Sequence, residues 1–105
     1  MDTSVADHII STHSNKVPII IENANDTNIG LTKHKFIVPC DMNLRQFYCV
    51  LKKYIENKSS KESIVIFINN TLPCMTETIG SLYTNNHNQD DKFLYIIVKK
   101  ESTFG

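Results

Sequence analysis

One amphipathic helix in the middle of the chain constrains the fold more than any other feature. Residues 43–56 are predicted to be helical because their apolar side chains recur with the 3.6-residue period of one helix side. Asn43 is expected to cap the first turn, with Gln46 completing a capping box. The apolar side consists of Leu44, Phe47, Tyr48, Val50, Leu51, Tyr54 and Ile55. Such a helix must pack against an apolar surface formed elsewhere in the chain.

Four short runs are predicted to form a sheet that supplies this surface. Residues 17–22 and 33–39 read as strands, and the Asn-, Asp- and Gly-containing segment 23–32 between them predicts a hairpin with a long loop. Residues 64–68 and 93–98 are apolar at successive positions, which is typical of interior strands covered on both faces. The sheet and the helix together would enclose one core.

Two smaller helical segments complete the predicted elements. Thr76 is expected to cap a short helix that runs through Ile79, Leu82 and Tyr83. Residues 1–16 are polar with a few apolar positions, which predicts one short N-terminal helical extension. This extension would cover part of the sheet face that lies opposite the main helix.

The order of these elements predicts the architecture. The order strand, strand, helix, strand, short helix, strand is that of the β-grasp, or ubiquitin-like, fold, an α+β arrangement with a four-stranded mixed sheet and one main helix. Residues 1–16 would form the extension and residues 17–105 the ubiquitin-like domain, with 99–105 as a polar C-terminal tail. A chain of 105 residues has room for one such domain.

Charge and cysteine content exclude several classes of function. Lys+Arg and Asp+Glu both total 11, so the chain lacks the basic excess of a nucleic-acid-binding protein. Three cysteines without a Cys-x-x-Cys pair favour free thiols in a reducing compartment over a disulfide framework. The longest apolar run, residues 93–98, is far too short to span a membrane, and residues 1–14 do not resemble a secretory signal.

Catalytic and metal-binding chemistry is not expected either. Cys40, Cys49 and Cys74 have no histidine placed beside them by local spacing, so they are interpreted as ordinary thiols. No Cys/His cluster has the spacing of a zinc site, and three glycines cannot form a glycine-rich phosphate loop. We therefore expect no catalytic residue, no metal and no cofactor, and interpret the protein as a substrate of enzymes.

Seven segments carry a family resemblance in the same order along the chain. They are residues 17–22, 33–39, 44–48, 67–70, 80–83, 93–96 and 101–105. In this set and order they resemble the autophagy-related protein 8, or GABARAP, family of ubiquitin-like modifiers. The segment before Val17 is shorter than is usual for that family and has Lys16 as its only Lys or Arg, and Tyr54 stands where a basic residue is common.

The resemblance implies a covalent function for the tail. The carboxylate of Gly105 would be activated by a ubiquitin-activating-type enzyme, passed to a conjugating enzyme as a thioester and joined to the amine of phosphatidylethanolamine. A deconjugating cysteine protease would be a further partner. Glycine suits this role because it lacks a Cβ and leaves its carbonyl open to a nucleophile. A flexible terminal glycine is common in other chains, so this role depends on the whole set of segments.

The expected function follows from that conjugation. The resemblance implies a cytoplasmic protein that reaches the autophagosome, or another vesicle membrane, through its lipid anchor. There it would act in autophagosome formation and recruit receptors or cargo that carry aromatic-x-x-aliphatic motifs. Two alternatives stay open, namely a ubiquitin-like modifier attached to a protein lysine and an unconjugated β-grasp scaffold that binds peptides.

Residues 33–39 are expected to form an edge strand that binds such motifs. The unpaired backbone of an edge strand can accept the strand of a partner peptide. Because successive side chains point to opposite faces, Lys35 and Ile37 would face the N-terminal side, and Phe36 and Val38 the main helix. A partner's aromatic and aliphatic residues, three positions apart, would then enter one crevice on each side.

The resemblance also implies which residues form the two crevices. The aromatic crevice would be formed by Ile9, Pro18, Lys35, Ile37 and Phe93. The aliphatic crevice would be formed by Phe36, Val38, Pro39, Met42, Phe47 and Val50. Acidic residues beside the partner's motif would meet Lys16, Lys33 and Lys35. Several of these also have a structural interpretation, since phenylalanines fill cores, prolines mark strand ends and lysines protect exposed edges.

Overall fold

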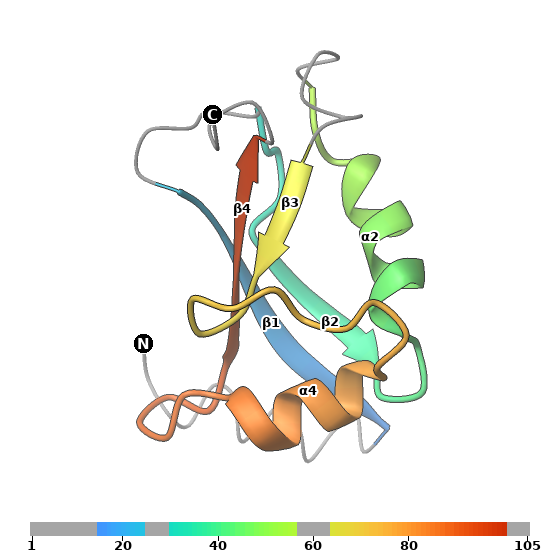
Figure 1. Ribbon diagram of the computed structural model, residues 1–105, viewed down its shortest axis with the longest axis vertical. Helices are drawn as coiled ribbons and strands as arrows, with labels where there is room; N and C mark the ends of the chain where they lie inside the picture. Colours follow the sequence, from blue (N-terminus) through green and yellow to red (C-terminus); the bar gives the residue numbers. More distant parts are fainter. Residues whose placement is uncertain (1–14, 25–29, 57–63, 101–105) are drawn as a thin grey trace.

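The computed structural model describes residues 15–24, 30–56 and 64–100 of the chain (Figure 1). Within these residues four strands and two helices follow the predicted order and form the ubiquitin-like β-grasp fold. The elements are β1 Lys16–Asn23, β2 Lys35–Pro39, α2 Leu44–Lys52, β3 Ile64–Phe67, α4 Ile79–Asn86 and β4 Leu94–Lys100. The predicted N-terminal helix and most of the predicted tail lie outside the described residues.

The sheet is mixed, as predicted, with the strand order β2-β1-β4-β3. β1 pairs with β2 antiparallel and with β4 parallel, and β3 pairs with β4 antiparallel. Figure 1 shows α2 lying across one face of this sheet. β2 and β3 are therefore the two edge strands, and β1 and β4 are the interior pair.

The prediction that residues 64–68 form an interior strand is wrong. β3 pairs with β4 alone, so only the 93–98 run corresponds to an interior strand, β4. β3 is apolar on both sides because Ile64 and Ile66 are buried in the core while Val65 and Phe67 are half-buried on the other face. The Lys99 Nζ lies 5.8 Å from the centroid of the Phe67 ring. Apolar side chains on both sides of a strand thus indicate that both of its faces are covered. They do not indicate that both of its edges are paired with other strands.

The core lies between the sheet and the two helices. Asn43 caps α2 through the predicted capping box, since its Oδ1 accepts from the Gln46 N–H and its own N–H donates to the Gln46 Oε1, both at 2.9 Å. α2 buries its apolar side against the inner face of the sheet. The fully buried side chains are Phe47, Phe93, Ile19, Ile21, Leu44, Leu51, Ile55, Ile79, Leu94, Ile96 and Val98.

α2 ends at Lys52 and not at the predicted residue 56. The segment before β2 accounts for this early end, because the Thr32 N–H donates to the Tyr54 carbonyl at 2.7 Å and the Glu56 N–H donates to the Gly30 carbonyl at 2.8 Å. Ile55 is still buried and forms a β-bridge with Leu31. Its position in the core explains why it fitted the helical period.

The N-cap of α4 is Thr78 and not the predicted Thr76. The Thr78 hydroxyl accepts from the Ser81 N–H at 3.2 Å, and Thr78 also forms a β-bridge with Asn43, the N-cap of α2. The two helices therefore start side by side. The Thr76 hydroxyl instead lies 3.0 Å from the Cys74 sulfur.

The outer face of the sheet carries a second, smaller apolar cluster. Ile20 and Phe93 are buried there, and Tyr95 packs against them. The Tyr95 hydroxyl donates to the Asp91 carboxylate, which also accepts from the Phe93 N–H at 3.0 Å. Desolvation and then this hydrogen bond raise the pKa of Tyr95 to about 12. This cluster places an apolar floor on the face opposite α2.

Candidate functional site

Among the described residues no strand pairs with the outer side of β2, which is an edge strand as predicted. The Ile21 N–H donates to the His34 carbonyl at 2.7 Å, and the Cys40 N–H donates to the Asn15 carbonyl at 2.8 Å. In an antiparallel pair the residues alternate between those bonded to the neighbour and those that are not. The N–H groups of Lys35 and Ile37 therefore point away from β1, towards the outside of the sheet.

The side chains of β2 divide between the two faces of the sheet as predicted. Phe36 and Val38 are buried in the core that α2 covers, with 5% and 3% of their surface exposed. Lys35 and Ile37 are exposed, and Ile37 keeps 41% of its surface accessible although it is a large hydrophobic residue. The edge thus presents an apolar side chain that nothing in the core requires.

On the outer face, the structure brings four of the five predicted aromatic-crevice residues together. Pro18 pairs with Ile37 in the register of β1 and β2, and the Lys35 Nζ lies 5.6 Å from the centroid of the Phe93 ring. Pro18 is buried and Phe93 is fully buried, whereas Lys35 and Ile37 are exposed beside them. Ile9 lies outside the described residues.

On the inner face, the aliphatic-crevice residues lie between β2 and α2. The Phe36 and Phe47 rings meet edge to face with their centroids 5.4 Å apart. Phe47 is 1% exposed and is therefore a core residue first, whereas Met42, Pro39 and Val50 are half-buried at the surface of the same region. All six predicted residues belong to adjoining elements, but Phe36, Val38 and Phe47 are not open to solvent.

Two of the three predicted lysines, Lys33 and Lys35, lie at or just before β2. Within the part of the chain that the structure describes, no carboxylate pairs with Lys33 or Lys35. The Lys33 Nζ instead lies 5.0 Å from the centroid of the Phe36 ring and 5.3 Å from that of Tyr54. Sequence reasoning placed Tyr54 on the apolar side of the helix but missed its contact with Lys33, because this contact depends on the segment that joins residues 30–34 to the end of α2. Lys16 is exposed at the start of β1.

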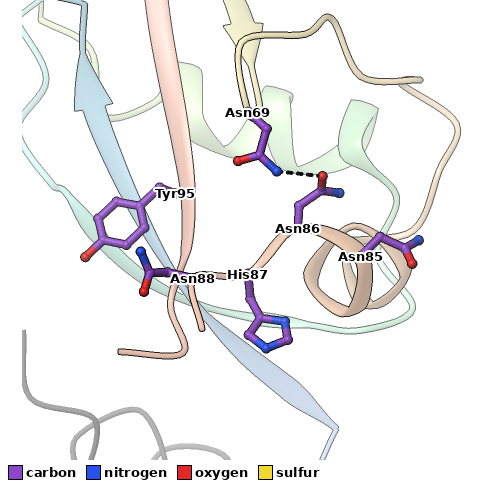
Figure 2. Close-up of a pocket in the computed structure, with 6 residues that line it drawn as sticks. All are labelled: Asn69, Asn85, Asn86, His87, Asn88 and Tyr95. Carbon is purple, nitrogen blue, oxygen red and sulfur yellow. Dashed lines mark hydrogen bonds between the residues drawn. The ribbon is translucent and has the colours of Figure 1, made fainter. Parts of the chain in front are cut away.

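A second hollow, which sequence reasoning missed, lies away from β2 (Figure 2). It has a volume of about 300 Å³. Its lining residues are Asn69, Asn85, Asn86, His87, Asn88 and Tyr95. The signal available in the sequence was the run of amide and imidazole side chains at 85–88, which covers the end of α4 and the two residues after it.

Among the described residues the thiols form no disulfide and no metal-binding group. Cys40, Cys49 and Cys74 are all free, and no set of three potential ligands lies together in residues 15–24, 30–56 and 64–100. A side-chain hydrogen bond with Thr76 is the main reason that the pKa of Cys74 is lowered. No helix in these residues is long and apolar enough to cross a membrane.

The fold is that of the ubiquitin-like proteins. Residues 2–105 match the family described as "Autophagy protein Atg8 ubiquitin like", and the chain belongs to this family. It is an autophagy protein and not an enzyme. The family is cytoplasmic and associated with autophagosomes.

Individual relatives agree with this assignment. Autophagy-related protein 8D of Oryza sativa subsp. japonica is 33% identical over 98 residues, which is 92% of this chain and 82% of the relative. The crystal structure of Trypanosoma brucei ATG8 superposes with a TM-score of 0.84 at 31% identity and covers 98% of this chain and 88% of that one. Plasmodium falciparum Atg8, in complex with a Plasmodium falciparum Atg3 peptide, has a TM-score of 0.77 at 24% identity over 91% and 85% of the chains, and shows the fold alone.

Proposed function

We propose that this protein is conjugated through Gly105 to phosphatidylethanolamine and recruits partners that carry aromatic-x-x-aliphatic motifs to the modified membrane. The observation that carries the proposal is the open edge of β2, which presents outward N–H groups at Lys35 and Ile37 with apolar side chains on both faces. A partner peptide would add to this edge as a further strand.

The two faces of the edge would receive different side chains. Residues three positions apart on an extended peptide point to opposite faces. The partner's aromatic side chain would pack on the outer face against Pro18, Ile37 and the Lys35–Phe93 pair. Its aliphatic side chain would pack on the inner face at Pro39, Met42 and Val50, with the buried Phe36, Val38 and Phe47 beneath them. Ile9 is proposed to complete the outer crevice.

Charge would favour acidic residues beside the motif. The ammonium groups of Lys33 and Lys35 lie over aromatic rings, and no carboxylate among the described residues neutralises them. Lys16 is also exposed on the neighbouring strand. Exposed charges of this kind mainly raise the association rate and select partners of opposite sign. The preference would weaken as salt is added.

The tail would provide the covalent attachment. β4 ends at Lys100, and the five residues that follow it can span at most about 18 Å. The amine of phosphatidylethanolamine would attack the thioester carbonyl of Gly105, forming an amide while the thiol of the conjugating enzyme leaves. Two acyl chains, at ~0.8 kcal/mol for each buried methylene, would then anchor the domain stably.

This proposal implies a set of enzymes as partners. An activating enzyme and a conjugating enzyme would supply the thioester, and a deconjugating cysteine protease would release the lipid. The Plasmodium neighbour binds an Atg3 peptide, which supports a peptide-binding role for this fold. The lipid-modified protein would reside on autophagosome or other vesicle membranes.

Reconstitution with mass measurement tests the proposed attachment. The protein is incubated with its activating and conjugating enzymes, ATP and phosphatidylethanolamine vesicles, and its intact mass is recorded. We expect a lipid adduct that is absent from the Gly105→Ala variant. A product linked to a protein lysine would instead show the protein-modifier alternative, and the absence of any adduct, with peptide binding retained, would show an unconjugated scaffold.

A further inference from the structure

The polar hollow shown in Figure 2 lies apart from the β2 edge and has no part in the proposed function. It is bounded by Asn69 after β3, by Asn85 and Asn86 at the end of α4, by the following His87 and Asn88, and by Tyr95 on β4. None of these lining residues carries a formal charge when the histidine is neutral. Its volume, about 300 Å³, is at the lower end of the range for small-molecule sites.

The side-chain amides of Asn69 and Asn88 each use one polar atom in a hydrogen bond within the protein and leave the other available to a ligand. The Asn69 Nδ2 donates to the Asn86 Oδ1 at 2.9 Å, so the Asn69 Oδ1 keeps its acceptor capacity. The Asn88 Oδ1 accepts from the N–H groups of Asp90 and Asp91 at 2.7 and 3.2 Å, so the Asn88 Nδ2 keeps its donor capacity. Figure 2 shows both of these atoms on the sides that face Tyr95.

The imidazole beside them is fixed in the same manner. The His87 Nδ1 lies 2.7 Å from the Tyr83 carbonyl oxygen, and its ring stacks on the Tyr83 ring with centroids 4.6 Å apart. A carbonyl can only accept, so Nδ1 carries the hydrogen, and Nε2 of the neutral ring is an acceptor. Figure 2 shows the imidazole ring directed away from Asn69, Asn88 and Tyr95. The groups that face the hollow are therefore one donor, the Asn88 Nδ2, and one acceptor, the Asn69 Oδ1, and both are held in place before any ligand arrives.

The backbone around the hollow is also held in place. The Asn88 N–H donates to the Phe93 carbonyl and the Asn88 carbonyl accepts from the Lys92 N–H, both at 2.8 Å. Asn69 has a φ of 51°, in the left-handed region that asparagine tolerates better than most residues. Ligand binding would thus require little further ordering of the protein.

We propose that this hollow is a binding site for an uncharged sugar. Each sugar hydroxyl can donate one hydrogen bond and accept others, so neighbouring hydroxyls can donate to the Asn69 Oδ1 and accept from the Asn88 Nδ2. An apolar ligand would bury these amide groups without partners, which is unfavourable. An anion would find no cationic side chain in the lining and would lie near Asp90 and Asp91.

Titration of the full chain with trehalose, followed by NMR, tests this inference. Trehalose is uncharged and non-reducing, so it does not modify lysines. We expect saturable shifts of the backbone amide signals at Asn69, at 85–88 and at Tyr95, with a dissociation constant in the millimolar range. Signals of β2 should stay unchanged, which separates this site from the proposed peptide edge.

A pair of matched variants assigns the effect to the hollow. Asn88→Asp keeps the oxygen that accepts from Asp90 and Asp91 but removes the Nδ2 donor, so we expect about tenfold weaker binding in a chain that still folds. Asn70→Asp makes the same chemical change at a neighbouring residue that does not line the hollow, and should bind trehalose as the unmodified protein does. The spectrum outside the hollow reports that each variant is folded.

Three outcomes would overturn the inference. The first is the absence of saturable shifts at the lining residues, which would mean that the hollow holds water only. The second is equal weakening in Asn88→Asp and Asn70→Asp. The third is binding of glucose 6-phosphate as tight as that of trehalose, which would show that the site does not select uncharged ligands.

Discussion

Phe36 and Phe47 meet edge to face, with their ring centroids 5.4 Å apart and their planes at 87°. This contact joins the edge strand β2 to the main helix α2. Both rings are buried, so the position of the edge relative to the helix depends on how they pack. The packing of the core therefore sets the position of the proposed docking edge relative to α2.

A double-mutant cycle measures this contact. Edge-to-face pairs contribute roughly 0.5–1.5 kcal/mol beyond the area they bury. We expect Phe36→Leu and Phe47→Leu each to lower the free energy of unfolding, and the double variant to lose about 1 kcal/mol less than the sum of the two. Urea denaturation followed by circular dichroism gives all four values. If the losses of the two single variants added up to that of the double variant, the rings would contribute only the volume they fill and no edge-to-face interaction energy.

Ile37→Asp tests the exposed rim of the docking edge. The side chain is exposed, so we expect the free energy of unfolding to change by no more than about 0.5 kcal/mol. Binding of an aromatic-x-x-aliphatic peptide, measured by fluorescence anisotropy, should weaken by about tenfold or more because a charge replaces an apolar contact. Val38→Asp is less informative, because Val38 is 3% exposed and a buried unpaired charge would unfold the protein.

The matched control is Leu72→Asp. Leu72 is the other exposed large hydrophobic residue among the described residues, with 68% of its surface accessible, and lies in the connection between β3 and α4. This variant introduces the same charge away from β2 and should bind the peptide normally. Equal loss of binding in both variants would show that charge alone, and not the β2 rim, controls the affinity.

Gly80 provides a test of the packing between α4 and the end of β2. A Cβ added at Gly80 would lie 2.9 Å from the Cys40 Cβ and 3.2 Å from the Cys40 carbonyl oxygen, which accepts from the Gly80 N–H. The backbone contact cannot relax without moving one of these segments. We expect Gly80→Ala to lower the free energy of unfolding by about 1–3 kcal/mol, measured by urea denaturation.

The control on the same helix is Thr84→Ala, whose exposed hydroxyl donates to the Gly80 carbonyl. This substitution should change stability by about 0.5 kcal/mol at most. A Gly80→Ala variant as stable as the unmodified protein would mean that α4 and Cys40 are not packed as closely as the structure describes.

The raised pKa of Tyr95 predicts that the protein loses stability in alkaline solution. Its pKa is raised to about 12, mainly by desolvation and then by the hydrogen bond to Asp91, whereas an unfolded tyrosine titrates near 10. The unfolded state therefore loses this proton first. The stabilising contribution is complete below pH ~10 and is lost as the pH rises towards 12.

The comparison with Tyr95→Phe isolates this contribution, because the two proteins differ only in the Tyr95 hydroxyl. Urea denaturation at several pH values above 9 should show a smaller decline of stability in the variant than in the unmodified protein. Parallel curves for the two proteins would contradict the raised pKa of Tyr95.

The sequence predicted those elements that depend on local periodicity and capping. The helix at 44–52, its Asn43–Gln46 capping box and the alternation of β2 follow from side-chain patterns that the fold preserves. The edge position of β3 was not predictable in this way, because side chains record which faces are covered and not which backbone groups are paired. The end of α2 depended on hydrogen bonds from the segment before β2, far away in sequence.

Part of the candidate site was also predictable from local side-chain patterns. The outward direction of Lys35 and Ile37 follows from strand alternation, whereas the burial of Phe47 and Phe93 depends on the elements that cover them. The amide-lined hollow escaped prediction because Asn69 and Asn88 meet only after β3, α4 and β4 are packed. Ile9 and Gly105 lie outside the described residues, so their proposed functions depend on experiment.

Hydrogen exchange at the Lys35 and Ile37 amides tests the central claim most directly. Both N–H groups point away from β1, so in the free protein they should exchange faster than those of Phe36 and Val38, which face that strand. Addition of a saturating aromatic-x-x-aliphatic peptide should protect both, because the peptide backbone becomes their acceptor. Peptide binding that leaves the exchange of both amides unchanged would contradict strand addition at β2.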